Sequence, residues 1–227
     1  MGRMKILFCA YRDWGKRIYQ YTNHYILEEM RNIHNYNMKL CVSSKELAKT
    51  DTSKYDLIFF IGWSDMIPST LTQKRNCICL HPSKLPEYRG GSPIQNQIMD
   101  GVKTSAITFF IMDEGMDTGE IIYQIPLDLS GDLDNIFSRI INSSYYVIGD
   151  IINEKASSGT LNSKPQNKLL PVKKRKTPSM SEITQKELSE LTAEDLYNKI
   201  RCLQDPYPNA YIICKDGSKL YITKSHL

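Results

Sequence analysis

The chain has 227 residues, of which 41% are hydrophobic and 24% charged, and its formal net charge at pH 7 is +4. This balance excludes an intrinsically disordered chain, and the mild positive charge does not require a nucleic-acid partner. Because no apolar run approaches the roughly 20 residues of a membrane span and no signal peptide is evident, we expect a cytoplasmic protein with no membrane partner.

Short apolar runs alternate with amphipathic stretches through the first half of the chain. We expect buried strands at five such runs, residues 5–9, 38–42, 57–61, 77–80 and 105–112. A polar loop at residues 11–16 precedes a stretch at about 17–32 with apolar residues at helical spacing. The candidates for its inner face are Ile18, Tyr21, Tyr25, Ile26 and Met30. Because strands separated by helices favour parallel pairing, we predict an α/β fold with a doubly wound, mostly parallel sheet.

The second half begins with a long helix and then changes in composition. Apolar residues at helical spacing predict a helix over about 132–156. Residues 157–181 are rich in Ser, Gly, Asn, Pro and Lys. The basic run at 173–176 could contact phosphates, although such runs are more often simply solvated. A helix near 193–203 follows, and then two strands are predicted at residues 210–214 and 219–222.

These changes divide the chain into three predicted parts. The main domain with its long helix spans 1–157, a basic linker loop spans 158–185, and a small C-terminal appendage of a helix and a β-hairpin spans 186–227. The two C-terminal strands are candidates for pairing with a second subunit, so a homodimer is one expectation.

The six cysteines do not form a recognisable metal site. They stand at positions 9, 41, 77, 79, 202 and 214. Cys77 and Cys79 are two residues apart rather than in a Cys-x-x-Cys pair, and no matching cluster of His or Cys lies nearby. We therefore expect no metal and a reducing compartment.

The segment 81–93 is the most unusual part of the sequence. Its three prolines and two glycines in thirteen residues exclude a helix or a central strand, so it must be an ordered loop. His81 directly follows the fourth predicted strand, and ligands of α/β sheets bind at the carboxyl ends of strands. Such a loop could hold a histidine in one tautomer while Lys84 and Arg89 meet an anionic substrate. A purely structural surface loop is the alternative.

A second polar segment directly follows the fifth predicted strand. Residues 113–117 contain three carboxylates, and Gly115 and Gly119 punctuate this stretch. A turn with two glycines can present backbone carbonyls and a carboxylate to one pocket. Composition leaves open a plain acidic turn before another strand that begins near residue 120.

Together the two segments resemble the hydroxymethyl- and formyltransferase family, which includes methionyl-tRNA formyltransferase, glycinamide ribonucleotide transformylase and the nucleotide-sugar N-formyltransferases. The family pattern is approximately Asn-x-His-x-Ser-x-Leu-Pro-x-x-Arg-Gly-x-x-Pro, followed later by Met-x-x-x-x-Asp-x-Gly-x-Ile. The matching residues here are His81, Ser83, Leu85, Pro86, Arg89, Gly90, Pro93, Met112, Asp117, Gly119 and Ile121. The resemblance covers roughly residues 4–125 well, and 174–178 and 200–208 loosely.

The resemblance implies transfer of a formyl group from N10-formyltetrahydrofolate to a primary amine, without a metal. His81 would act as general base toward the amine and help to stabilise negative charge on the formyl oxygen. Asp117 would orient His81 and assist proton transfer to the departing folate nitrogen. The residues expected to contact the folate are Trp63, Met66, Ile67, Asp113, Gly115 and Asp117.

One position departs from the family pattern. The family has a side-chain amide two residues before the histidine, where this chain has Cys79. A thiol is a weak hydrogen-bond donor, and loss of one oxyanion donor costs about 100- to 1,000-fold in turnover. A backbone N–H or a water could replace the amide, the enzyme could be slow, or the position could be engineered. Two further readings are a catalytic Cys79 nucleophile and a binding module without turnover.

The loop after the first strand bears on the acceptor. Aromatic Tyr11 and Trp14 could stack on a nucleobase or sugar, and Arg12 and Lys16 could bind a diphosphate. The expected acceptor contacts are Tyr11, Arg12, Trp14, Lys16, Ser83, Lys84, Tyr88, Arg89 and Gly90. Since residues 85–93 are most similar to the amino-sugar enzymes, we expect a UDP- or dTDP-linked amino sugar as acceptor. Methionyl-tRNA or another amine is the alternative, although the mild net charge argues against a nucleic-acid partner.

Overall fold

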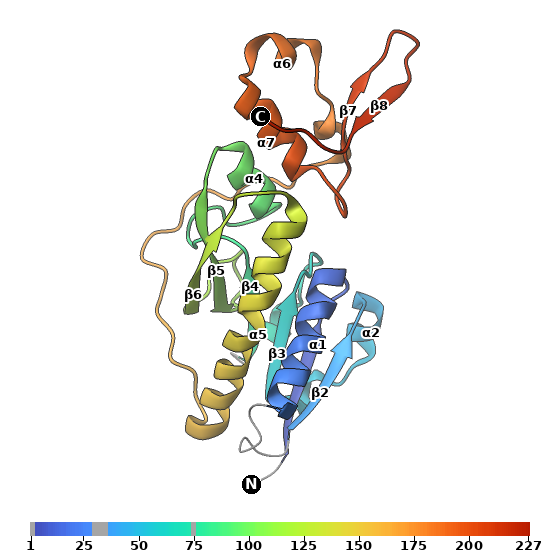
Figure 1. The fold of residues 1–227 in the computed structure, drawn as a ribbon. Helices are drawn as coiled ribbons and strands as arrows, with labels where there is room; N and C mark the ends of the chain where they lie inside the picture. Colours follow the sequence, from blue (N-terminus) through green and yellow to red (C-terminus); the bar gives the residue numbers. More distant parts are fainter. Residues whose placement is uncertain (1–2, 29–35, 74–75) are drawn as a thin grey trace.

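The strands of the main sheet follow the predicted apolar runs. The computed structural model describes residues 3–28, 36–73 and 76–227. The six strands of this sheet are β1 (Met4–Cys9), β2 (Tyr36–Cys41), β3 (Leu57–Ile61), β4 (Cys77–His81), β5 (Thr104–Ile111) and β6 (Ile121–Asp128). Their order across the sheet is β2-β1-β3-β4-β5-β6 (Figure 1).

Four of the six strands are parallel, which confirms the predicted α/β fold with a mostly parallel sheet. β2, β1, β3 and β4 pair in parallel, whereas β5 pairs antiparallel with both β4 and β6. The simple rule that helices between strands imply parallel pairing was therefore wrong for β5. The chain crosses between β4 and β5 through the loop after His81 and the short helix α4 (Pro93–Met99), and it re-enters the sheet in the opposite direction.

The buried strands explain why the helices cover both faces of the sheet. In β3 every residue is buried, with Phe59 packed in one core cluster and Ile58 and Phe60 in the other. Successive side chains of a strand point to opposite faces, so an entirely apolar strand needs a cover on each side. One face is covered by α1 (Asp13–Glu28) and α5 (Leu133–Ser158), which pack against each other (Figure 1). The short helices α2 (Ser44–Lys49) and α3 (Ser69–Thr72) lie at the other cluster.

Helix α1 begins earlier than the sequence pattern predicted. It starts at Asp13, so residues 13–16 of the polar loop expected at 11–16 form its first turn. Gly15 allows this start, because a Cβ atom there would lie 2.7 Å from the carbonyl oxygen of Ile61 at the end of β3. Of the expected inner face, Ile18 and Ile26 are buried, Tyr25 is half-buried, Tyr21 is exposed, and Met30 lies outside the described residues.

The strand order predicts a ligand site at the carboxyl ends of β1 and β3. The connection from β1 leads to β2 on one side, and β3 lies on the other side of β1, so the strand order reverses between β1 and β3. In open α/β sheets the crevice at such a reversal is the usual binding site. The loops that follow β1 and β3, together with that after β4, border one cavity.

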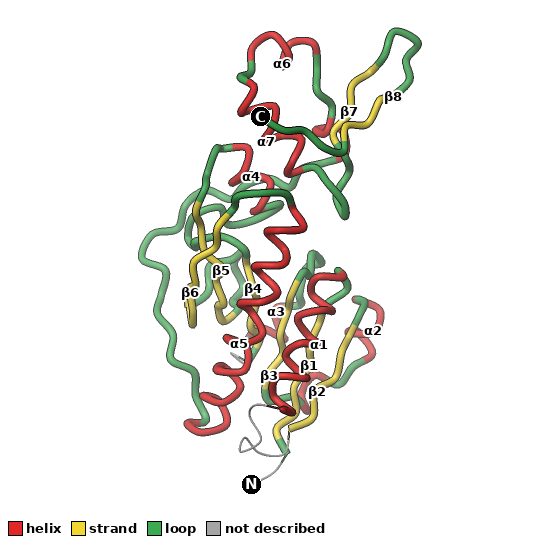
Figure 2. The backbone as a smooth tube through the Cα atoms, viewed as in Figure 1, coloured by secondary structure: helices red, strands yellow, loops and turns green. Residues whose placement is uncertain are grey.

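The C-terminal part packs against the same end of the domain. It contains α6 (Gln185–Glu190), α7 (Ala193–Cys202) and the hairpin of β7 (Ala210–Ile213) and β8 (Lys219–Ile222), and α7 packs on α4. Between α5 and the short 3-10 helix at Pro178–Ser181 the chain has no regular helix or strand (Figure 2). We name residues 159–176 of this connection the crossing segment. It passes along the outer strand β6, to which it is joined at Ile121 and Lys164 (Figure 1).

Among residues 3–28, 36–73 and 76–227, no helix is both long enough and apolar enough to cross a membrane.

Candidate functional site

A cavity of about 680 Å³ opens where the loops after β1, β3 and β4 meet the turn between β5 and β6. His81 ends β4 and faces this cavity, as its place after a parallel strand predicted. The acidic turn reaches the site by a different route from the one expected. Because β5 is antiparallel, its last residue Ile111 lies beside Ile78 near the start of β4. The turn then doubles back far enough for Asp117 to meet His81.

His81 is buried and held by a backbone carbonyl. Its Nε2 atom lies 3.0 Å from the carbonyl oxygen of Tyr88. A carbonyl oxygen only accepts hydrogen bonds, so the proton of the neutral imidazole is assigned to Nε2. Nδ1 then carries the lone pair, and it lies 3.5 Å from Oδ2 of Asp117. A proton taken up at Nδ1 would therefore be placed directly against a carboxylate.

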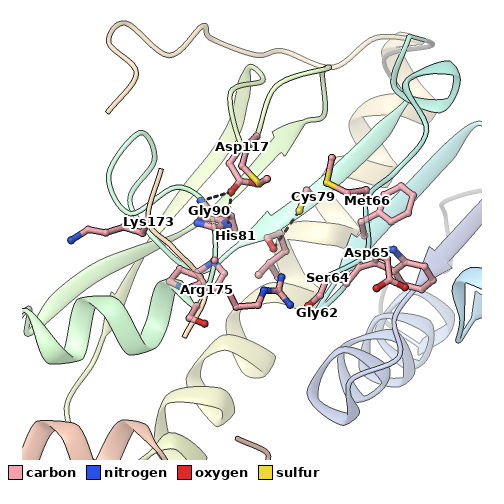
Figure 3. A pocket seen from close by; sticks show the side chains of 18 of the residues that line it. Gly62, Ser64, Asp65, Met66, Cys79, His81, Gly90, Asp117, Lys173 and Arg175 are labelled. Atoms are coloured by element: carbon pink, nitrogen blue, oxygen red, sulfur yellow. Dashed lines mark hydrogen bonds and ion pairs between the residues drawn. The ribbon is translucent and has the colours of Figure 1, made fainter. Parts of the chain in front are cut away.

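The loop that follows His81 fixes the side chain of Asp117. The backbone N–H of Gly90 donates a hydrogen bond of 2.7 Å to Oδ2 of Asp117, the oxygen that faces His81 (Figure 3). The backbone of Asp117 is in the left-handed region, with φ of 53°. This conformation is uncommon for a residue with a Cβ atom, and such conformations cluster at functional sites. The structure thus brings together the two side chains on which the sequence argument depends.

The thiol of Cys79 also lines the cavity, two residues before His81. Burial raises its pKa well above the ordinary value, and the Asp117 carboxylate raises it further. The thiol is therefore neutral at physiological pH, and a neutral thiol is neither a good nucleophile nor a strong hydrogen-bond donor.

All of the residues predicted to contact a folate border this cavity. They are Trp63, Met66 and Ile67 after β3, and Asp113, Gly115 and Asp117 after β5. Met66 is 82% exposed and stands at the rim. Trp63 packs between the rings of Tyr11 and Phe60, with centroid distances of 5.3 and 6.0 Å.

The predicted acceptor contacts divide into two groups. Arg12, Trp14 and Gly90 line the cavity. The others, Tyr11, Lys16, Ser83, Lys84, Tyr88 and Arg89, lie outside the lining, and their roles toward a ligand stay predictions.

Several of these outlying side chains have local partners that account for their positions. Lys16 pairs with Asp13 at 3.0 Å, and the hydroxyl of Ser83 donates to the carbonyl oxygen of Glu87 at 2.7 Å. The ring of Tyr88 lies under the ammonium group of Lys173, which is 4.9 Å from its centroid.

All four residues of the basic run 173–176 line the cavity, and Lys174 and Arg175 are also exposed to solvent. The backbone explains their placement. Lys173 donates its N–H to the carbonyl oxygen of Arg89 at 2.8 Å and accepts from the N–H of Gly91 at 2.9 Å. The N–H of Lys176 donates to the hydroxyl of Ser92 at 3.0 Å.

Two further residues, Gln95 and Tyr207, line the cavity although neither was predicted to contact a ligand. Arg12 lies over the ring of Tyr207, 5.6 Å from its centroid, so the tail of the chain completes the wall that begins after β1. The loose resemblance noted over residues 200–208 was the one available signal for Tyr207.

Charges of both signs line the cavity, and they come from different segments of the chain. The carboxylates of Asp65, Asp113, Glu114 and Asp117 come from the loops after β3 and β5. The cations of Arg12, Lys174, Arg175 and Lys176 come from the loop after β1 and from the crossing segment. Among the described residues, none of these four cations has a carboxylate partner within 4.0 Å, so they are available to an anionic ligand.

Comparison with known proteins gives one consistent family. A model of the formyl transferase family matches residues 15–139. Methionyl-tRNA formyltransferase of Halalkalibacterium halodurans is 31% identical over 172 residues, which cover 74% of this chain and 53% of that protein. Across the relatives that align with most of this chain, the chain spans about half of their length.

Solved structures agree over nearly the whole chain. Methionyl-tRNA formyltransferase from Clostridium thermocellum has a TM-score of 0.77 at 27% identity, and the match covers 96% of this chain and 97% of that one. A sugar N-formyltransferase from a Shewanella species has a TM-score of 0.70 at 19% identity, with 98% and 97% covered. The second likeness shows the shared fold alone.

Proposed function

Because the chain belongs to the formyl transferase family, we propose that it transfers a formyl group from N10-formyltetrahydrofolate to a primary amine. The observation that carries this proposal is the pair of His81 and Asp117 in the cavity wall, with Nδ1 and Oδ2 3.5 Å apart. In an amine transfer the attacking nitrogen must lose a proton, and an imidazole beside a carboxylate is suited to receive it.

The contacts of His81 define its proposed role. The Tyr88 carbonyl holds the Nε2 proton, so Nδ1 is the atom that accepts a proton from the amine. The resulting imidazolium is stabilised by Asp117, whose carboxylate is oriented by the N–H of Gly90. Cys79 offers a neutral thiol where the family has an amide, so it supplies at most a weak donor to the formyl oxygen.

The part of the cavity near the acidic turn suits the donor. Apolar and aromatic walls come from Phe60, Trp63, Phe110 and Met112, and Asp113 adds a polar group at the edge. Flat heteroaromatic rings bind in such sites, where stacking area combines with a few placed polar groups. When bound there, N10-formyltetrahydrofolate would supply the formyl group next to His81.

The acceptor is proposed to carry phosphate. The cations of Arg12, Lys174, Arg175 and Lys176 all line the cavity, and guanidinium and ammonium groups bind phosphate oxygens strongly. Methionyl-tRNA is the first acceptor to test, because the curated relatives favour it. A UDP- or dTDP-linked amino sugar is the second, favoured by the adjoining aromatic and cationic residues Arg12 and Tyr207.

The proposal is tested by mixing the protein with N10-formyltetrahydrofolate and each acceptor, and by following both tetrahydrofolate release and the formylated product. The His81→Ala variant is expected to lose about 100- to 10,000-fold in turnover, the usual contribution of a general base. Each acceptor is also compared with an analogue that carries the same amine but no phosphate, and we expect the analogue to have the higher KM.

The matched control is His24→Ala, which removes an exposed histidine of α1 and is expected to leave turnover unchanged. Formylation of only one acceptor class identifies the substrate. Binding of donor and acceptor without release of tetrahydrofolate would instead identify a binding module without turnover. Equal activity of the wild type and His81→Ala would contradict the proposed role of the imidazole.

A further inference from the structure

The crossing segment contacts the turn at residues 113–119, which we name the Asp117 turn, and also the loop at residues 82–92 that follows His81. The side-chain Nε2 of Gln166 donates two hydrogen bonds, of 3.0 Å to the carbonyl oxygen of Asp117 and of 2.9 Å to that of Gly119. A glutamine amide has two N–H donors, so each carbonyl can receive its own proton. Gln166 therefore binds the backbone at Asp117 itself and again two residues later, at Gly119.

The turn at Asp117 has a backbone conformation that is uncommon for a residue with a Cβ atom. Asp117 has a φ of 53°, in the left-handed region where a Cβ atom is unfavourable. At Gly119 the chain runs so close to β5 that a Cβ atom would lie 1.7 Å from the carbonyl oxygen of Ile111. A residue in such a conformation persists only where surrounding contacts determine it.

The position of Gln166 is itself set by backbone pairing. Two residues earlier, Lys164 exchanges two hydrogen bonds of 2.8 Å with Ile121, the first residue of β6. This bridge fixes the crossing segment at the point where the turn re-enters the sheet. At its other end the same segment pairs through Lys173 with the backbone beside Gly90, whose N–H binds Asp117.

We propose that Gln166 is a positioning residue for the reaction: its amide holds the Asp117 turn so that the carboxylate faces Nδ1 of His81. This inference rests on the proposed function, because it assigns Gln166 a task in the same proton transfer. Gln166 does not line the cavity that His81 and Asp117 border, so any effect of Gln166 on the reaction passes through Asp117.

Two substitutions separate this task from simple packing. Gln166→Glu keeps the shape of the side chain but turns a carboxylate toward two carbonyl oxygens, so it both removes the donors and adds repulsion. Gln166→Leu removes the donors without adding charge. If the hydrogen bonds position Asp117, activity decreases in the order wild type, Gln166→Leu, Gln166→Glu. If the side chain only fills space, the isosteric glutamate is the better tolerated of the two.

The kinetic test measures kcat and both KM values in the full-length protein. We expect kcat of Gln166→Glu to fall on the order of 100-fold, the usual effect of misplacing a catalytic group by about an ångström. Both KM values are expected to change little, because Gln166 does not line the cavity. The matched control is Gln20→Glu, the same substitution at an exposed position of α1, which is expected to keep full activity.

A crystal structure of Gln166→Glu provides a readout that does not depend on activity. We expect the distance between Nδ1 of His81 and Oδ2 of Asp117 to exceed the 3.5 Å found here, and Asp117 to leave the left-handed region. An unchanged Asp117 turn in that structure overturns the inference, as does a folded variant with wild-type kcat. If the wild type formylates no acceptor, the proposed function fails, while the structure of the variant still tests whether Gln166 holds Asp117.

Discussion

Backbone conformations that side chains avoid are concentrated at the candidate site. In the described residues, three non-glycine residues have a positive φ, namely Tyr88, Ser92 and Asp117. The carbonyl oxygen of Tyr88 accepts a hydrogen bond from His81, and the hydroxyl oxygen of Ser92 accepts one from the N–H of Lys176. The carboxylate of Asp117 faces His81. Each such residue costs about 1–3 kcal/mol. The three residues with an unfavourable positive φ therefore all hold polar groups in place around the same cavity.

The state of Cys79 leads to a prediction about its reactivity with pH. Burial and the Asp117 carboxylate both raise the pKa of this thiol, so less of it is thiolate at pH 8 than for an ordinary cysteine. The thiolate is the form that alkylating reagents attack. We expect iodoacetamide to modify Cys79 at least about ten-fold more slowly than an ordinary thiol, since one pKa unit corresponds to ten-fold. The rate should increase as the pH rises above 9.

Peptide mapping by mass spectrometry measures this rate, and Cys214 serves as an internal reference because it is also partly exposed. Asp117→Asn provides the second arm. Removal of its charge should speed the alkylation of Cys79 and leave that of Cys214 unchanged. Modification of Cys79 at neutral pH as fast as that of Cys214 would contradict a neutral thiol and return Cys79 to consideration as a nucleophile.

At the level of elements, the strands were the most predictable part of the chain. Each predicted strand overlaps an observed one, because apolar runs of about four to eight residues bounded by turn signals are typical of buried strands. The start of α1 was missed because Gly15 is a poor helix former by itself. Its place in the helix depends on a contact with Ile61, which is 46 positions away in the chain and leaves no local signal.

The same close approach leads to a prediction about stability. In Gly15→Ala the new methyl group would lie 2.7 Å from the carbonyl oxygen of Ile61 and 3.1 Å from Cβ of Ala10, so α1 or the end of β3 must move. Overpacking of this kind costs about 1–3 kcal/mol, whereas alanine gains about 0.5–1 kcal/mol as the better helix former. We expect a net loss of about 1–2 kcal/mol in the free energy of unfolding.

Urea unfolding followed by circular dichroism measures this loss. Gln20→Ala places an alanine on the exposed side of the same helix and is expected to leave stability unchanged or slightly improved. A Gly15→Ala protein as stable as the Gln20→Ala control would mean that α1 has room beside β3, and that Gly15 is not required by the packing.

For the whole molecule, the sequence predicted which segments carry the site but not how they are fastened together. His81 and Asp117 were found because each belongs to a motif with fixed local spacing. The contacts of the crossing segment join Gln166 to Asp117 and Lys173 to Arg89, over separations of 49 and 84 residues. The acceptors in both contacts are backbone carbonyl oxygens, which every residue has, so the residue types give little sign of these contacts.

The C-terminal part is fastened to the domain by a buried guanidinium group. Nη1 of Arg201 in α7 donates to the carbonyl oxygens of Leu129 and Gly131 at 2.7 and 2.9 Å, just before α5. Burial lowers the pKa of this guanidinium from its ordinary value. Because the chain continues from α7 to Tyr207, these hydrogen bonds also support one wall of the cavity. Stability of the C-terminal part and binding of the acceptor should therefore depend on the same residue.

Arg201→Leu is expected to lower the free energy of unfolding by about 1.5–3 kcal/mol, the usual value for hydrogen bonds to a charged group. The KM for the acceptor should rise, while the KM for the folate donor stays the same, because Tyr207 lies with Arg12 rather than with the acidic turn. Arg139→Leu is the matched control. Arg139 donates to carbonyl oxygens of the same loop, at Asp128 and Ser130, but its side chain is 37% exposed. Its loss should cost less than about 1 kcal/mol, and equal losses in the two variants would mean that burial adds nothing to the Arg201 contacts.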